Sequence, residues 1–158
     1  MNALALPCRT EILPTIRDIS LVTVRRRGLF NSPEFTAHLL TLAGNLSIPV
    51  LMISQSSAEG NLCLVIPRHD DQLLLSKLYD DLRTEPATIT LTLANDVIVL
   101  NVMTQGGQFD GLACLFATLE SAGIEVLASS CGIRQGGVSI VIPGTQEWQA
   151  VAALRHMG

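Results

Sequence analysis

The second half of this sequence repeats the first in a constant register, and this repeat limits the folds open to the chain. Residues 50–56 align with residues 126–132, and the same register continues without a gap to Pro67 over Pro143. Chance similarity between apolar strands does not account for prolines that match at matching distances. The repeat therefore indicates that a supersecondary unit has been duplicated.

The first repeat has a pattern of alternating strands and helices. Residues 19–24 are apolar and β-branched, as expected of a strand. A helix is expected to follow, with Ser32 as its cap, Pro33 in its first position and apolar residues at helical spacing up to Leu46. The remaining elements are expected to be strands at 50–54, 62–66 and 88–93 and a helix at 70–82. This order, β-α-β-β-α-β, is that of ferredoxin-like domains.

The second repeat matches the first but stops before its last strand. It is expected to contain strands at 97–103, 125–130 and 138–142 and two helices, the last carrying the apolar residues Trp148, Val151, Ala152 and Leu154. Without a fourth strand the sheet would keep an unpaired edge, which is an aggregation hazard. We therefore expect the leading segment, residues 8–13 before Pro14, to cross over and complete the second sheet.

These assignments predict an α+β fold of two ferredoxin-like modules, the first inserted in the second. The first module is expected at 15–94, and the second at 8–14 together with 95–158. Hydrophobic residues make up 48% of the chain and charged residues only 15%, so the chain can bury a core and is not expected to be disordered.

Charge and hydropathy argue against a nucleic acid or a membrane as partner. The formal net charge is -4, whereas binding to a phosphate backbone requires clustered lysines and arginines. The one local exception, residues 25–27, is typical of a solvated strand end. No run approaches the roughly 20 apolar residues of a membrane helix. The first residues lack the features of a signal sequence, so we expect a cytoplasmic protein.

No set of residues has the spacing of a catalytic or metal site. We find no G-x-S-x-G, no paired catalytic carboxylates and no metal-ligand pattern, and we expect no catalytic residue, no cofactor and no metal. The four cysteines are scattered without a C-x-x-C pair, at Cys8, Cys63, Cys114 and Cys131. This distribution is typical of reduced, mostly buried thiols rather than of disulfides or zinc ligands.

The run from Ile48 to Glu59, Ile-Pro-Val-Leu-Met-Ile-Ser-Gln-Ser-Ser-Ala-Glu, resembles the regulatory ACT domains of aspartokinases. It is most similar to the bifunctional aspartokinase–homoserine dehydrogenases, in which a strand ending in I-S/T-Q-S-S-S-E is a signature. The resemblance extends more loosely from Thr10 to Met157 and implies the same inserted arrangement of two modules. Aspartokinases also carry a kinase domain, but this sequence has no glycine-rich nucleotide loop and a single lysine, Lys77. It is similar in length and layout to the small regulatory subunit of two-subunit aspartokinases.

The resemblance implies a site for a free amino acid at an interface between modules. Residues 28–35 would supply backbone N–H groups at a helix start, and residues 50–52 would supply the edge of a strand. The implied ligand-binding positions are Asn31, Ser32, Phe35, Val50, Leu51, Gln55 and Ser56. Structural roles remain possible as a plainer interpretation of each residue. Ser32 could cap the helix, Gln55 could fix the end of a strand through a hydrogen bond, and Phe35, Val50 and Leu51 could be core residues.

Departures from the family pattern bear on the ligand. Lysine-sensing aspartokinases look as though they hold an acidic group where this chain has Leu51. An apolar residue there would leave the second ammonium of lysine unpaired, which is costly, so threonine or another small amino acid is favoured over lysine. In the second repeat Cys131 replaces the counterpart of Gln55, and Gln135 replaces that of Glu59. The second site is therefore expected to be degenerate, with Cys131 a buried neutral thiol and the module supporting a dimer.

The sequence is compatible with two functions. The first is a non-catalytic amino-acid-binding regulatory protein that acts on a separate kinase subunit. The second is a structural dimerisation module of ACT type that has lost its ligand. An RNA-binding ferredoxin-like domain is disfavoured, because the strands lack stacking aromatic residues. We expect a homodimer formed by side-by-side pairing of exposed edge strands.

Overall fold

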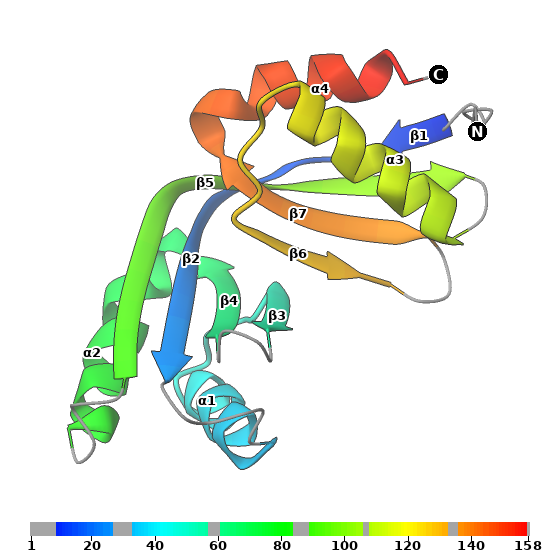
Figure 1. The fold of residues 1–158 in the computed structure, drawn as a ribbon. Coiled ribbons are helices and arrows are strands. Elements are labelled where there is room, and N and C mark those ends of the chain that lie inside the picture. The colour runs from blue at the N-terminus through cyan, green and yellow to red at the C-terminus, as the bar shows by residue number, and fades with distance from the viewer. Residues whose placement is uncertain are drawn as a thin grey trace. The chain divides into compact units, whose positions relative to one another are not determined.

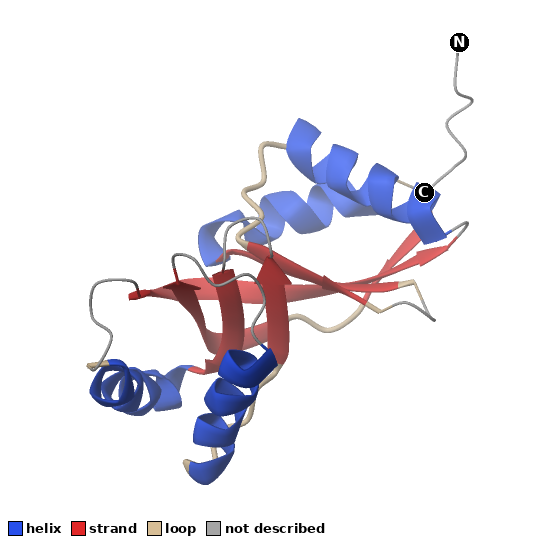
Figure 2. Ribbon diagram, turned by 60° about the horizontal axis from the view of Figure 1, so that its bottom comes forward, coloured by secondary structure: helices blue, strands red, loops and turns tan. Residues whose placement is uncertain are grey.

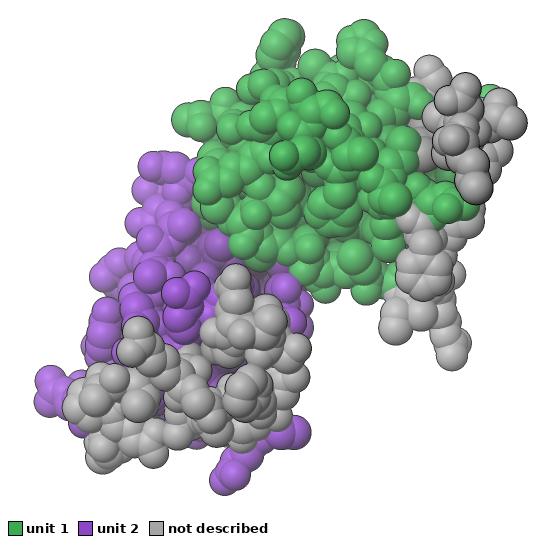
Figure 3. Space-filling view, in the orientation of Figure 1, with its two compact units in different colours: residues 1–17, 97–158 green, residues 18–96 purple. Residues whose placement is uncertain are grey.

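The computed structural model describes residues 9–26, 33–56, 61–83, 89–105, 108–132 and 136–157. The chain divides into two compact units, shown in different colours in Figure 3. Unit 1 comprises residues 1–17 and 97–158, and unit 2 comprises residues 18–96. Each unit is built from one copy of the sequence repeat.

Unit 2 is an antiparallel sheet with two helices on one face (Figure 1). Its strand order is β3-β4-β2-β5, and β5 continues from it into unit 1. Its elements in chain order are β2 (Ile16–Arg26), α1 (Pro33–Asn45), β3 (Met52–Ser56), β4 (Asn61–Pro67), the short 3-10 helix η1 (Arg68–Asp70), α2 (Asp71–Leu82) and the first part of β5 (Ile89–Gln105). Alternate residues of β2 and β4 point to the helices, so that Val22 and Leu64 meet Leu39 and Leu74 in one core.

Unit 1 has the same plan, with strand order β1-β5-β7-β6. Its elements are β1 (Arg9–Ile12), the rest of β5, α3 (Gln108–Ser121), β6 (Ala128–Cys131), β7 (Gly137–Pro143), the 3-10 helix η2 (Gly144–Gln146) and α4 (Glu147–Arg155). Both helices again cover one face of the sheet (Figure 2). The leading segment forms β1, which pairs antiparallel with β5 from Arg9 opposite Gln105 to Ile12 opposite Val102.

Four α-helices and an antiparallel sheet within the described residues confirm the expected α+β class. None of the helices within these residues is long and apolar enough to cross a membrane. Trp148 departs from the expected apolar face of α4, because 83% of it is exposed. Ala150 and Leu154 of the same helix are buried and form the contact with the sheet.

The two copies share details of their backbone hydrogen bonding. The Leu51 N–H donates to the Val65 carbonyl at 2.8 Å, and the Leu127 N–H donates to the Val141 carbonyl at 2.9 Å. These pairs occupy matching positions of the repeat. Each contact attaches the start of an edge strand to its neighbour, so the duplication extends to the way in which the sheet edges are built.

Candidate functional site

The implied ligand-binding residues that the structure describes belong to α1, to β3 and to the segment just before β3 in unit 2. Asn31 and Ser32 fall outside the described residues, as does Glu59. Phe35 is in the first turn of α1, where it is half-buried and packs against the core of the unit. Val50 is also half-buried against that core. These two residues therefore contribute to packing, in agreement with their plainer interpretation.

Leu51 and Gln55 are different, because both are exposed. Leu51 precedes β3 and is 44% exposed, so its interpretation as a core residue is wrong. Gln55 lies on β3 opposite Leu62, and the next residue, Ser56, lies opposite Asn61. An exposed apolar side chain thus stands just before the strand, and an exposed amide lies near the end of the strand.

β3 is the end strand of the sheet of unit 2. Among the described strands it pairs with β4 alone. A strand at the edge of a sheet presents backbone N–H and C=O groups that can pair with another chain or with a ligand. Ile53 adds a second exposed apolar side chain, at 36%. The site therefore combines backbone hydrogen-bonding groups with a partly apolar surface.

Arg25 places a positive charge at this end of the sheet, and the sequence did not mark it as a ligand-binding residue. Arg25 at the end of β2 is exposed, and its Nε donates to the Asn61 side-chain oxygen at 2.9 Å. Asn61 lies opposite both Arg25 and Ser56, so the three residues form one row across β2, β4 and β3. The arginine run was interpreted as a solvated strand end, and sequence alone does not reveal which strand its members face.

The matching region of unit 1 is built differently. Gly111 of α3 stands where unit 2 has Phe35, and a Cβ at Gly111 would lie 2.8 Å from Cβ of Thr104. The first turn of α3 therefore rests directly on the end of β5. The Thr104 N–H also donates to the Gly136 carbonyl at 3.0 Å. This hydrogen bond attaches the end of β5 to the residue that precedes β7.

The cysteines also differ from expectation. Cys131, the counterpart of Gln55, is exposed rather than buried, because it lies at the outer end of the edge strand β6. Cys114 on α3 is disulfide-bonded, which contradicts the expectation of reduced thiols. Cys63 and Cys131 are free. Gln135 lies outside the described residues, so the expected degeneracy of the second site stays a prediction. Within the described ranges no three His, Cys, Asp or Glu side chains form a metal-binding group.

The chain is similar to known proteins in sequence and in structure. No family model matches the sequence. The bifunctional aspartokinase/homoserine dehydrogenase 2, chloroplastic, of Arabidopsis thaliana is 26% identical over 145 residues, which cover 89% of this chain but only 16% of the relative. The ligand-free regulatory subunit of aspartate kinase from Thermus thermophilus gives a TM-score of 0.75 at 16% identity, covering 94% of this chain and 97% of that chain. A chain from the crystal structure of aspartokinase alpha and beta subunits gives 0.73 at 18% identity, covering 95% of each.

The fold is thus that of the regulatory subunits of aspartokinases. In sequence and fold together, the chain resembles the regulatory (ACT) region of aspartate kinases and of bifunctional aspartokinase/homoserine dehydrogenases, and it covers only that regulatory part. The resemblance inferred from residues 48–59 is confirmed.

Proposed function

We propose that the chain is a non-catalytic regulatory protein that binds a small free amino acid and thereby regulates an aspartokinase-type kinase. In this proposal the two units are ACT modules, with unit 2 inserted in unit 1. The observation that carries it is the open edge strand β3, with the exposed Gln55 on it and the exposed Leu51 directly before it, within the segment that resembles the family signature.

The proposed ligand lies at the outer side of β3, beside the start of α1. Backbone N–H and C=O groups of the strand edge would bind the ammonium and carboxylate of the amino acid, and Gln55 would donate or accept one further hydrogen bond. Phe35 and Val50 pack against the core of unit 2, and in this proposal they form the apolar layer between the core and the bound amino acid.

Threonine, or another small amino acid, is favoured over lysine. Leu51 offers an apolar contact and no charge. The second ammonium of lysine would have to be buried against it without a counter-ion, which costs free energy. A threonine side chain has a methyl group for the apolar contact and a hydroxyl group for one hydrogen bond.

The same edge supports a homodimer. Leu51 and Ile53 place two exposed apolar side chains beside the open edge of β3, where a second chain could cover both. Side-by-side pairing of two β3 strands would extend the sheet across the interface. A ligand held at this joint would stabilise the paired arrangement, and a kinase partner that contacts the dimer would sense the change.

An alternative function is a structural dimerisation module that has lost ligand binding. Leu51 and the exchange of Gln55 for Cys131 in the other unit favour this alternative. It predicts the same dimer but no amino acid effector.

Isothermal titration calorimetry of the full chain with each common amino acid distinguishes the two functions. We expect heat with threonine or another small amino acid, at least about tenfold weaker binding for Gln55→Ala, about 1.4 kcal/mol, and unchanged binding for the matched variant Cys131→Ala. If none of the amino acids produces heat or a thermal shift, the regulatory proposal fails and the structural alternative holds.

A further inference from the structure

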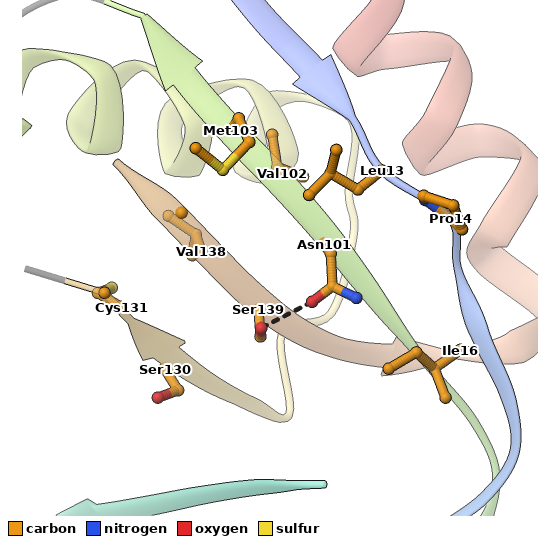
Figure 4. Close-up of a pocket in the computed structure, with 12 residues that line it drawn as sticks. Leu13, Pro14, Ile16, Asn101, Val102, Met103, Ser130, Cys131, Val138 and Ser139 are labelled. Carbon is orange, nitrogen blue, oxygen red and sulfur yellow. Dashed lines mark hydrogen bonds between the residues drawn. The ribbon is translucent and has the colours of Figure 1, made fainter. Parts of the chain in front are cut away.

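Unit 1 contains an open hollow of about 580 Å³ on the face of its sheet that points away from the helices (Figure 4). Val102 and Val138 belong to the core under the helices. Side chains alternate along a strand, so Asn101 and Ser139 point the other way, into the hollow. The volume is within the range of pockets that hold small molecules.

Comparison with unit 2 shows how the lining of the hollow differs from the matching surface of the other copy. In unit 2 the last row of this face holds Arg25 hydrogen-bonded to Asn61. The matching pair in unit 1 is Met103 opposite Gly137, and a Cβ on Gly137 would already lie 3.2 Å from the Met103 sulfur. The Met103 sulfur therefore lies close to where a side chain at position 137 would begin, and the charged, hydrogen-bonded pair of the other copy is replaced here by a thioether beside a glycine.

A row of polar side chains forms the floor beside this space. Asn101, Ser139 and Ser130 lie opposite one another on β5, β7 and β6. The Ser139 hydroxyl donates to the Asn101 side-chain oxygen at 2.7 Å (Figure 4). Among the described residues the Asn101 amide nitrogen and the Ser130 hydroxyl have no hydrogen-bond partner. Two N–H donors and one hydroxyl group are thus available to a molecule in the hollow.

The rest of the lining is apolar and carries no fixed charge. Leu13, directly after β1, Ile16, the first residue of β2, and Met103 of β5 supply aliphatic and thioether surface. No Asp, Glu, Lys, Arg or His is among the described residues that line the hollow. A charged group placed there would lose hydration without gaining a counter-ion.

We infer that this hollow binds a small uncharged molecule with a branched aliphatic body and a carbonyl acceptor, such as a carboxamide. The carbonyl oxygen accepts from the Asn101 amide, and the aliphatic body packs against Leu13, Ile16 and Met103. Cys131 borders the hollow at the end of β6, but it lies opposite the core residue Val138, so the alternation of side chains directs its thiol to the other face of the sheet. The hollow does not depend on the effector site proposed for unit 2.

The probes for the test differ only in their polar group: isovaleramide, isovalerate and isopentylamine. Each is titrated into the ¹⁵N-labelled full chain and followed by NMR chemical shifts. We expect isovaleramide to bind with a Kd of about 1–10 mM, the range of a weakly held fragment, with shift changes centred on Asn101, Ser130 and Ser139. The carboxylate and the amine are expected to bind at least about tenfold more weakly.

Two variants and one matched control test the geometry. Asn101→Leu removes the donor at nearly constant volume, and Gly137→Asn places the side chain of unit 2 in the hollow. Each is expected to weaken isovaleramide binding at least about tenfold, whereas Thr23→Val, the position in unit 2 that matches Asn101, leaves it unchanged. Either of the two variants suffices if the other does not fold.

Three results would overturn the inference. The first is no binding of isovaleramide, or binding of either charged probe with equal or higher affinity. The second is binding that both Asn101→Leu and Gly137→Asn leave intact. The third is a change at these resonances that depends on protein concentration instead of on the probe, which would assign this face to contact with a second copy of the chain.

Discussion

Ser47 and Gly123 occupy the same position after equivalent helices, and both have a left-handed backbone, with φ of 56° and 67°. The N–H of Ser47 donates to the Gly44 carbonyl at 3.0 Å, and that of Ile48 donates to the Ala43 carbonyl at 2.9 Å. This pair of bonds is the Schellman motif, which requires a residue of positive φ directly after the helix. Gly123 makes the matching bond to Glu120, so the two copies end their first helix in the same way.

The motif predicts opposite effects for two substitutions. A left-handed conformation costs a residue with a Cβ about 1–2 kcal/mol, so Ser47→Gly is expected to raise the free energy of unfolding by about 0.5–1 kcal/mol after the greater chain entropy of glycine is subtracted. Gly123→Ala is expected to lower it by about 1 kcal/mol, although no atom lies within 4 Å of the added Cβ. Urea denaturation measures both changes, and a loss of stability in Ser47→Gly would contradict the assignment.

A buried hydrogen bond ties β2 to α2 in unit 2. The Ser20 hydroxyl donates to the Asp71 carboxylate at 2.9 Å, and the two residues are 0% and 5% exposed. Ser20→Ala leaves a buried carboxylate without this donor, and we expect it to lower the free energy of unfolding by about 1.5–3 kcal/mol. The control is Ser76→Ala on the exposed side of α2, which is expected to change stability by less than about 0.5 kcal/mol. Equal effects of the two variants would show that the bond contributes little.

The close contact between α3 and β5 makes a third prediction. A Cβ on Gly111 would lie 2.8 Å from Cβ of Thr104, which is β-branched and has little freedom to move. Gly111→Ala is therefore expected to destabilise the chain by about 1–3 kcal/mol. Gly44 on α1 is the matched control, because nothing lies within 4 Å of its Cβ position and Gly44→Ala should stabilise the helix by about 0.5–1 kcal/mol. Thermal unfolding of both variants gives the comparison, and a neutral Gly111→Ala would contradict the contact.

The proposed dimer has its own test at the edge strand. Ile53 is exposed on β3, and Ile53→Lys places a charge on the edge, which blocks pairing between strands. We expect light scattering at micromolar concentration to give a dimer for the unchanged chain and a monomer for Ile53→Lys. Leu73→Lys, which changes an exposed leucine on α2, is expected to leave the dimer intact. A monomeric unchanged chain, or a dimer that survives Ile53→Lys, would exclude pairing through β3.

Local patterns in the sequence predicted most elements of the fold, although the strands expected at 88–93 and 97–103 form the single strand β5. The α+β class and the four helices follow from apolar periodicity, which is a property of neighbouring residues. Trp148 shows the limit of this reasoning. It was grouped on one apolar face with Val151 and Leu154, and those two residues do pack against the core together with Ala150, whereas Trp148 at the start of α4 is exposed. Periodicity gives the face of a helix, but the packing decides how far along the helix that face is covered.

For the candidate site, too, the sequence predicted some features and the tertiary structure decided others. The sequence singled out Leu51 and Gln55 through their resemblance to a family pattern, which also implied a strand edge at residues 50–52, but its plainer interpretation of Leu51 as a core residue was wrong because Leu51 is exposed. It also gave no reason to connect Arg25 with Asn61, because these residues become neighbours only through the register of β2 against β4. Cys131 was expected to be buried, and its position at the outer end of β6 exposes it.

The sequence by itself determined that two copies of one unit are present, which segments form helices and strands, and which family the chain resembles. These properties depend on residue order and short-range spacing. The tertiary structure alone decided which side chains share a row across neighbouring strands, where a hollow opens in unit 1, and which apolar residues stay exposed. Strand register and helix rotation join residues that are far apart in the chain, and the free energy that selects them comes from packing the whole core.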